Sequence, residues 1–360
     1  MSGSLPQYWS LRDARAASPA PGATLVIQPL PGIGDMVWHL PHLHALAARA
    51  GSGVWLLTKR RAGAERLLRG DPAVAGLLWL ERKPGRHDGW LGFWRLVGLL
   101  RAGRFAEVWI LHDSARYAWA ARLAGIPRRY GYGFTGQQAL TQTRFLGRAE
   151  QRLHPLIKAY RLLELLGVGP LEDEPHLALA ADAVAAVGER YGHLPQPWLA
   201  LGVGSSEPYK QWGAARFAEL ARALPGRGIG TVLVLGGPAE RRLAQDILAA
   251  AQHPAVVAVT DLPLDQSAAL LARCQAYVGN DTGVLNMAAA LGVPALGLFG
   301  ASPPLHHSRH IHPLTPAAGA GMAAIDAAQV LVALNGLVPD LDRPQPHHKR
   351  SGACPPRSPD

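Results

Sequence analysis

Short apolar runs alternate with longer stretches in which apolar residues recur at helical spacing, from residue 24 to about residue 337. A run of four to seven apolar residues between glycine, proline or polar residues is typical of a buried strand, and the longer stretches are typical of amphipathic helices. In the first half the predicted strands cover residues 24–30, 54–58, 76–80 and 107–111. The predicted helices cover residues 36–49, 62–69, 91–101, 117–124 and 153–166.

The second half of the chain repeats this order. Its predicted strands cover residues 198–203, 231–235, 256–260, 276–279 and 295–299. Its predicted helices cover residues 214–223, 239–250, 267–273, 283–291 and 321–334. Strict alternation of strands and helices favours parallel sheets with helices on both faces. We therefore predict an α/β protein with two Rossmann-like halves, which face each other across a cleft at the carboxyl ends of their strands.

A length of 360 residues corresponds to two domains of ordinary size. Residues 169–175 are polar and rich in helix breakers, which indicates a linker between the domains. The predicted organisation is a flexible N-terminus (1–22), a first α/β domain (23–170), a second α/β domain (171–338) and a disordered tail rich in Pro, His and basic residues (339–360).

The net charge of +10 is unevenly distributed along the chain. Residues 1–170 hold 23 Lys and Arg against 10 Asp and Glu, whereas residues 171–360 hold 13 against 16. This asymmetry suggests that the first half meets an anionic partner, although arginines scattered over a solvated surface would give the same counts. No cluster of basic residues interleaved with aromatic residues is apparent, which argues against nucleic acid as the partner.

The compartment is indicated by what the sequence lacks. Two cysteines, Cys274 and Cys354, make no disulfide framework and favour a reducing compartment. Residues 1–21 have no apolar segment typical of a signal peptide, and the apolar runs are far shorter than the ~20 residues needed to span a bilayer. We expect a soluble, cytoplasmic protein.

The first candidate motif is Pro31-Gly32-Ile33-Gly34-Asp35, between a predicted strand and a predicted helix. Glycines in such a turn let the backbone approach a ligand closely, and a helix N-terminus favours negative charge. Asp35 could cap the amides of its own helix, or it could accept a proton from a hydroxyl nucleophile. The third glycine and the later acidic residue of a dinucleotide-binding fingerprint are missing.

Two further loops follow predicted strands of the second half. In the run 202–212, Ser205, Ser206 and Lys210 could hold a diphosphate, or the run could be an ordinary loop with a solvated lysine. In the run 279–283, Asp281 and Thr282 precede a helix that begins near Gly283, where they could cap the helix or face a phosphate. An aspartic protease is excluded, because that chemistry needs a second matching Asp in a β-rich fold.

Two other sets of polar residues are candidates for binding. Glu240 follows a Gly-Gly-Pro turn, where its carboxylate could accept hydrogen bonds from a ribose or cap a helix. His306, His307, His310 and His312 surround Arg309. Four imidazoles could bind a metal, but no Cys or acidic residue accompanies them, so we favour a solvated loop and expect no metal site.

Taken in order, these motifs resemble those of glycosyltransferase family 9, the bacterial heptosyltransferases with a GT-B fold. The resemblance runs from about residue 24 to residue 337. Its most specific stretch is Asn280-Asp281-Thr282-Gly283 with the following residues 288–292, Pro294 and residues 298–300. The runs 205–212 and 236–240 match the family's nucleotide loop and the motif after it, and 31–35 matches its N-terminal glycine–aspartate motif.

The resemblance implies an inverting transfer from a nucleotide-diphosphate sugar, with ADP-heptose as the expected donor. The implied acceptor is an anionic lipopolysaccharide-core saccharide, linked to lipid at the inner face of the inner membrane, so the expected location is the cytoplasm or, as a peripheral protein, that face of the membrane. It assigns Asp35 as the general base, Glu240 to the ribose and Asp281 to the donor sugar. It assigns Ser205, Ser206 and Lys210 to the binding of the diphosphate, together with the backbone around Thr282 and Gly283. It places Gly32 and Gly34 in the loop on the acceptor side. No metal or other cofactor is implied.

One position departs from the family pattern, because Asn286 stands where the family commonly has His after Asp-Thr-Gly. Asn cannot carry a charge, so the donor or the acceptor could differ from the family's usual one. The alternatives are a family 9 enzyme with another donor or a protein acceptor, and a non-catalytic protein that binds a nucleotide sugar. A nicotinamide dehydrogenase is disfavoured by the missing fingerprint.

Overall fold

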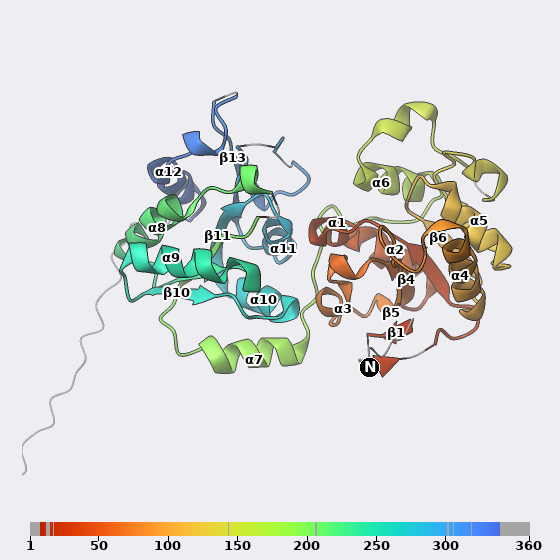
Figure 1. Cartoon of the computed structure of the whole chain (residues 1–360), viewed down its shortest axis with the longest axis horizontal. Helices are drawn as coiled ribbons and strands as arrows, with labels where there is room; N and C mark the ends of the chain where they lie inside the picture. Colours follow the sequence, from red (N-terminus) through yellow and green to blue (C-terminus); the bar gives the residue numbers. More distant parts are fainter. Residues whose placement is uncertain are drawn as a thin grey trace, which may run out of the picture.

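The computed structural model describes residues 8–11, 15–16, 18–142, 144–205, 207–300, 302–304, 306–317 and 319–338. Two sheets lie side by side, each with helices on both faces (Figure 1). The prediction of an α/β protein with two Rossmann-like halves is therefore confirmed. Among the described residues, no helix is long and apolar enough to span a membrane.

The first sheet has the strand order β2-β1-β5-β4-β3-β6-β7. Its strands are β1 (Tyr8–Ser10), β2 (Arg15–Ala16), β3 (Thr24–Ile27), β4 (Val54–Thr58), β5 (Val74–Trp79), β6 (Glu107–Ile110) and β7 (Arg128–Gly131). Strands β3 to β7 are parallel, whereas β1 pairs antiparallel with β5 and with β2. The segment 1–22, expected to be flexible, thus contributes the edge strand β2 and its neighbour β1.

Helices cover both faces of the first sheet. They are α1 (Ile33–Trp38), α2 (Leu40–Ala50), α3 (Ala64–Leu67), α4 (Gly89–Ala102), α5 (Ala115–Leu123) and α6 (Pro155–Leu165). Leu25 and Leu57 share a core with α4 and α5, whereas Val26 and Leu56 share another with α1, α2 and α6. The helix predicted over 36–49 is two helices, since Pro41 stands in the first turn of α2, where its missing N–H costs no hydrogen bond.

The second sheet is parallel throughout, with the order β10-β9-β8-β11-β12-β13. Its strands are β8 (Trp198–Gly202), β9 (Thr231–Leu235), β10 (Val256–Val259), β11 (Cys274–Asn280), β12 (Ala295–Leu298) and β13 (Ile311–Leu314). Five of them match predicted strands. The sequence pattern missed β13, since this edge strand contains His312 and Pro313, and proline is confined to such edges because it cannot donate to the ladder.

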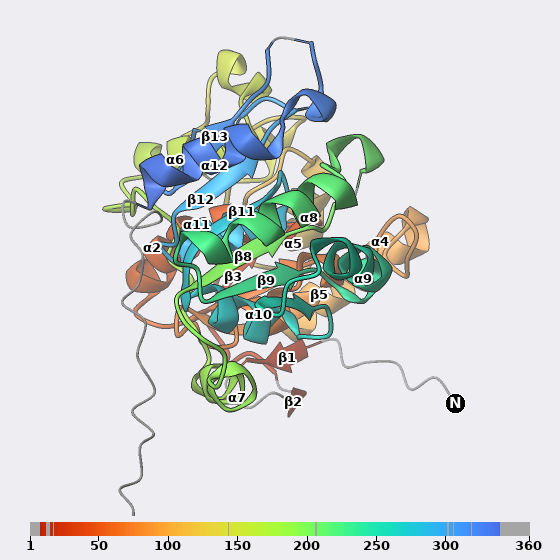
Figure 2. The ribbon, with the colours of Figure 1, turned by 90° about the vertical axis from the view of Figure 1, so that its left-hand side faces the viewer.

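The helices of the second half are α7 (Ala181–Tyr191), α8 (Ala214–Ala223), α9 (Arg241–Ala251), α10 (Leu264–Leu271), α11 (Gly283–Ala290) and α12 (Ala327–Leu337). Helices α8, α9 and α12 pack on one face of the sheet and stand in front of it in Figure 2. On the other face α10 and α11 join a core that also includes residues of the first half. Helix α7, which was not predicted, packs against α10.

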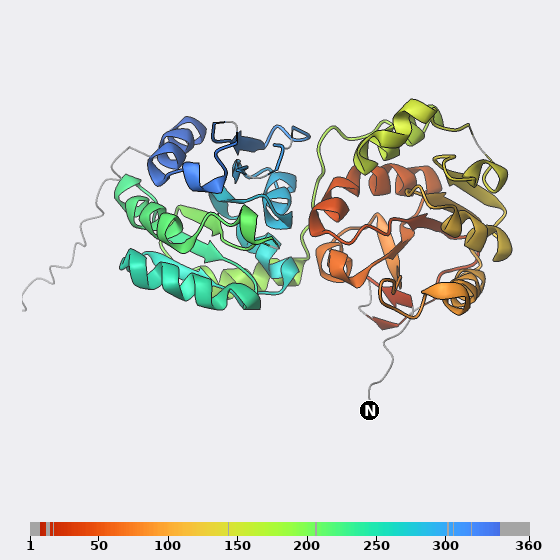
Figure 3. The same cartoon turned by 45° about the horizontal axis from the view of Figure 1, so that its top comes forward.

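Within the part of the chain that the structure describes, the backbone passes between the halves once, in the segment 166–180 between α6 and α7 (Figures 1 and 3). The predicted linker, residues 169–175, lies inside this segment. The backbone N–H of Leu177 donates to the carbonyl of Ala290 at the end of α11, 3.0 Å away. Helix α1 also packs on α11, and α3 on α10, so the halves are in direct contact. The predicted tail, 339–360, lies outside the described residues.

Candidate active-site cleft

A cavity of about 500 Å³ lies between the two halves. Its walls come from the loop after β3, from the carboxyl ends of β8 and β9, and from the first residues of α11. Of the predicted site residues, Gly32, Gly34, Ser205, Glu240, Thr282 and Gly283 line this cavity. Four of the separate motifs thus meet at one site, as open α/β sheets place ligands at carboxyl strand ends.

Glycine is required where α1 meets α11. A Cβ at Gly34 would clash with Nδ2 of Asn286, and a Cβ at Gly283 would lie 2.7 Å from Cβ of Ile33. Asn286 is buried and donates from Nδ2 to the carbonyl of Thr282 at 3.4 Å. These two glycines let the N-termini of the two helices approach, so that backbone from both halves borders the same cavity.

Asp35 lies in the first turn of α1 and is partly buried. Its Oδ2 accepts a hydrogen bond from the backbone N–H of Gly32 at 3.1 Å, so the capping interpretation has direct geometric support. The carbonyl of Asp35 accepts a hydrogen bond from Nδ1 of His39 at 2.6 Å, and burial lowers the pKa of that imidazole. Asp35 is not among the described residues that line the cavity, although Gly32 and Gly34, which precede it in the same loop, are.

Lys210 takes part in an ion-pair cluster at the carboxyl ends of the second sheet. Its Nζ lies 3.1 Å from Oδ2 of Asp281 and 2.9 Å from Oε2 of Glu207. Ser302 donates to the same Oδ2 of Asp281 at 2.7 Å. Burial lowers the pKa of Lys210, but hydrogen bonds and charges of Glu207 and Asp281 outweigh burial and leave this pKa raised. The ammonium group is therefore charged and held beside two carboxylates.

Asn280 fixes the loop that carries Ser205 and Lys210. Its amide oxygen accepts from the backbone N–H of Trp212 at 3.1 Å, and its Nδ2 donates to the carbonyl of Gly204 at 3.1 Å. The buried Trp212 anchors the far end of the loop by donating from its indole to the carbonyl of Ile325 at 2.8 Å. Sequence reasoning quoted Asn280 as part of a motif but gave it no role.

Glu240 lines the cavity from the turn after β9. Its Oε2 accepts from the backbone N–H of Gly237 at 2.8 Å, the local capping contact that the sequence left open. The same contact orients the carboxylate at the cavity wall, so capping and ligand binding are compatible here. Ser205 also lines the cavity, and its hydroxyl donates to the carbonyl of Glu207 at 2.8 Å. Ser206 lies outside the described residues.

Sequence reasoning missed Arg61, which carries the sole positive charge among the described lining residues. It follows β4 in a short 3₁₀ helix, Arg60–Ala62, at the same sheet edge as the loop of Asp35. The available signal was a basic run, Lys59-Arg60-Arg61, directly after a buried strand. Leu262, Leu264 and Ser267 also line the cavity, from around the start of α10.

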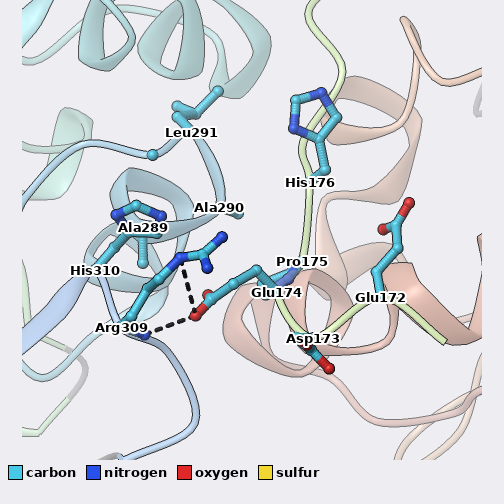
Figure 4. A pocket seen from close by; sticks show the side chains of 11 residues that line it. Glu172, Asp173, Glu174, Pro175, His176, Ala289, Ala290, Leu291, Arg309 and His310 are labelled. Carbon is cyan, nitrogen blue, oxygen red and sulfur yellow. Dashed lines mark hydrogen bonds and ion pairs between the residues drawn. The ribbon is translucent and has the colours of Figure 1, made fainter.

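The histidine-rich run 306–312 is spread over different surroundings. His307 lies edge-on to Trp38 of α1, whereas His312 lies in β13. Arg309 and His310 border a second cavity of about 390 Å³ beside the linker, where the backbone N–H of Arg309 donates to Oε1 of Glu174 at 2.7 Å (Figure 4). No group of three or more potential metal ligands occurs among the described residues.

Comparisons with known proteins agree with this arrangement. A family model described as glycosyltransferase family 9 (heptosyltransferase) matches residues 93–331. Lipopolysaccharide heptosyltransferase 2 of Salmonella typhimurium is 30% identical over 254 residues, which cover 60% of this chain and 67% of that protein. Lipopolysaccharide heptosyltransferase 1 of Pseudomonas aeruginosa is 30% identical over 299 residues, which cover 76% of this chain and 77% of that protein.

Solved structures show the same fold. The Escherichia coli ADP-heptose lipopolysaccharide heptosyltransferase II superposes with a TM-score of 0.69 at 25% identity, covering 88% of this chain and 98% of that one. A family 9 glycosyltransferase of Veillonella parvula gives 0.73 at 22% identity, covering 89% and 97%. These likenesses confirm the predicted GT-B fold. Because the family model matches well over half of the chain, the protein belongs to glycosyltransferase family 9, the heptosyltransferases.

Proposed function

We propose that the protein transfers heptose from ADP-heptose to a lipopolysaccharide-core saccharide, with inversion at the anomeric carbon and without a metal ion. The observation that carries this proposal is the cavity between the halves, where four separate motifs of the sequence converge. Support for the donor comes from the related structures described as an ADP-heptose heptosyltransferase and as heptosyltransferase WaaC with ADP-2-deoxy-2-fluoro heptose.

The diphosphate is proposed to lie against the second half, at the N-terminus of α11. The cavity is lined there by Thr282 and Gly283, whose backbone opens the helix, and by Ser205 opposite. Lys210 lies in the adjoining loop, where Asp281 and Glu207 hold its ammonium group. A diphosphate would compete with these carboxylates for the lysine. Amide dipoles and fixed cations can neutralise a leaving diphosphate, which is why no metal is needed.

The sugar and the ribose are assigned to the two carboxylates of the second half. Glu240 lines the cavity with its Oε2 held by the amide of Gly237, so the ribose hydroxyls can donate to this carboxylate. Asp281 is held by Ser302 and Lys210, which leaves it beside the expected diphosphate and suited to accept from a donor-sugar hydroxyl. A carboxylate is a strong acceptor for sugar hydroxyls, because an ionised partner strengthens the hydrogen bond.

The acceptor is proposed to enter from the first half. Asp35 would take the proton of the acceptor hydroxyl, whose oxygen then attacks the anomeric carbon, while the bond from that carbon to the diphosphate oxygen breaks. Asp35 must turn its carboxylate from the Gly32 amide or use its second oxygen for this step. Arg61 would hold an anionic group of the acceptor, in line with the positive balance of residues 1–170.

The purified protein with a lipid-linked or deacylated core acceptor tests the proposal directly. Mass spectrometry should show one added heptose with ADP-heptose, and no addition with ADP-glucose or UDP-sugars. Nuclear magnetic resonance of the product should show inverted anomeric configuration, and a chelator should leave the rate unchanged. Product formed from another nucleotide sugar but not from ADP-heptose would overturn the donor assignment.

A further inference from the structure

Two neighbouring helices of the first half expose large apolar side chains. Trp90, Leu91 and Trp94 of α4 are 70%, 63% and 44% exposed, and Trp119 of α5 is 50% exposed. We refer to these four residues as the α4–α5 patch. The rings of Trp90 and Trp94 pack edge to face at 6.0 Å, so the apolar surface of α4 is continuous. Helices α4 and α5 lie at the end of the molecule away from the second sheet (Figures 1 and 3).

The α4–α5 patch belongs to one rigid surface. At one end of the helix pair, Arg116 donates to the carbonyls of His87 at 2.8 Å and Gly89 at 3.0 Å. At the other end, Arg101 donates to the carbonyl of Leu123 at 2.7 Å. The two helices therefore run side by side, with their exposed faces on the same side of the sheet.

The α4–α5 patch is not needed for the folding of these helices. The opposite side of α4 already buries Leu96, Val97, Leu99 and Leu100 against the first sheet. An amphipathic helix normally turns polar residues to the solvent once its apolar stripe is buried. Contiguous exposed aromatic residues on a folded protein mark an interaction surface.

The two helices of the α4–α5 patch also expose arginines. Arg95 and Arg101 on α4 and Arg122 on α5 are exposed, and none of the three lies within ion-pair distance of a carboxylate among the residues the structure describes. The nearby Asp88 is engaged, since it accepts from the backbone N–H of Lys83 at 2.8 Å and pairs with Arg82. The helices that carry the apolar patch thus also expose cationic side chains. Trp90, Leu91, Trp94 and Arg95 are close together in the sequence, but only the fold shows that their side chains stay exposed and that Trp119 belongs to the neighbouring helix.

We propose that the α4–α5 patch docks the protein on an anionic lipid bilayer. Tryptophan is favoured at the bilayer–water interface, where its apolar ring and its N–H are both accommodated, and arginines are attracted to anionic headgroups. Helix α4 has 14 residues, too few to span a bilayer, so it lies along the surface. A two-fold contact with a second copy would instead bring the arginines of both copies together without acidic partners.

The position of the α4–α5 patch suits an acceptor carried by a membrane. Helix α4 follows the carboxyl end of β5 after the loop 80–88, and the loop of Asp35 follows β3, two strands away in the parallel part of the sheet. Trp90 and Leu91 at the start of α4 therefore lie at the same sheet edge as Asp35. Docking at this edge would bring the acceptor side of the cleft toward lipid-linked saccharides. This functional consequence rests on the proposed function, whereas binding to lipid does not.

Vesicle flotation with the full-length protein tests docking independently of catalysis. The wild type should float with vesicles of equal parts phosphatidylcholine and phosphatidylglycerol, and not with phosphatidylcholine alone. Trp90→Ser with Trp94→Ser should lower the partition coefficient by tenfold or more, on the order expected when two interfacial rings are lost. Val332→Ser on α12 is the matched control, since Val332 is 73% exposed in the other half and should leave binding unchanged.

Substitutions of the arginines test the electrostatic contribution to vesicle binding. Arg95→Gln and Arg122→Gln should each weaken binding to anionic vesicles by about fivefold, and raised salt should do the same. Melting temperatures within a few degrees of the wild type would show that the variants fold. Equal flotation of the wild type and the tryptophan double variant would overturn the proposal, as would no flotation of the wild type. A wild-type dimer that the tryptophan changes dissociate, seen by analytical ultracentrifugation, would assign the patch to a second copy instead.

Discussion

Replacing Asp35 by Asn separates a structural role from a catalytic one. The carboxylate accepts one hydrogen bond from Gly32 at 3.1 Å in the first turn of α1, and the amide oxygen of Asn can accept the same bond. What the helix loses is a negative charge near its N-terminus, which contributes about 0.3–1 kcal/mol at such a site. The free energy of unfolding should therefore fall by less than about 1 kcal/mol, a shift of a few degrees in melting temperature.

The catalytic consequence should be far larger. Asn cannot accept the proton of the acceptor hydroxyl, and loss of a general base typically lowers the rate by ~10²–10⁴-fold. That loss corresponds to about 3–5 kcal/mol of transition-state stabilisation, several times the expected change in stability. Donor affinity should stay within a few-fold, because the proposed donor contacts come from the second half.

The assay is steady-state heptose transfer by the purified variant, together with donor binding by calorimetry and thermal melting. Asp326→Asn is the matched control: Asp326 also accepts an amide hydrogen bond at a helix N-terminus, from Gln329 at 2.7 Å, but on α12. This control should transfer heptose at the wild-type rate. Transfer by the Asp35 variant above about a third of the wild-type rate would refute the general-base assignment and leave Asp35 as a helix cap.

Three further variants test the rest of the site. Lys210→Ala should weaken ADP-heptose binding by about 1.5–3 kcal/mol in calorimetry, because it removes a charged donor and leaves two carboxylates near the diphosphate. Unchanged affinity together with an unchanged melting temperature would exclude Lys210 from the site. Arg61→Ala should raise KM for the anionic acceptor several-fold more than KM for the donor, and the reverse would place Arg61 on the donor. Burial lowers the pKa of His44, but Asp71 and Glu172 outweigh it and raise this pKa to about 9. The charged imidazole therefore makes its full contribution to the free energy of unfolding below about pH 6.5. This contribution, at most about 3 kcal/mol, is lost as pH rises through about 9. In His44→Ala, the free energy of unfolding measured with urea should no longer fall over this pH range. An identical fall in the variant would contradict the assignment of the pH dependence to His44.

Local pattern was sufficient for the elements with a strong apolar signal. Strands β4 and β9 and helix α8 begin and end at the predicted residues. Each is a buried apolar run, or an amphipathic repeat, bounded by glycine or polar residues, and these signals lie within a few positions of one another. Strands β7 and β13 were missed, because their residues are mixed polar and apolar and they become strands by pairing with β6 and β12.

The site was predicted in the same uneven way. The loops with Asp35, Ser205, Glu240 and Thr282 were identified from glycine and polar residues after strands, and the fold brings all of these loops to one cavity or its border. Arg61 was missed, because the basic run Lys59-Arg60-Arg61 does not show by itself whether a side chain faces a cleft or the solvent. Its position follows from the order of the strands in the first sheet.

The sequence by itself determined the α/β class, the two halves, the family and most of the loops that carry the site, since each depends on residues close together in the chain. Only the tertiary structure decided which distant groups meet. The close approach of Gly34 to Asn286, the pairing of Lys210 with Asp281 and the packing of α4, with Trp94, beside α5, with Trp119, are of this kind. Such contacts depend on how sheets and helices pack as whole layers, and local periodicity carries no information about the distance between two layers.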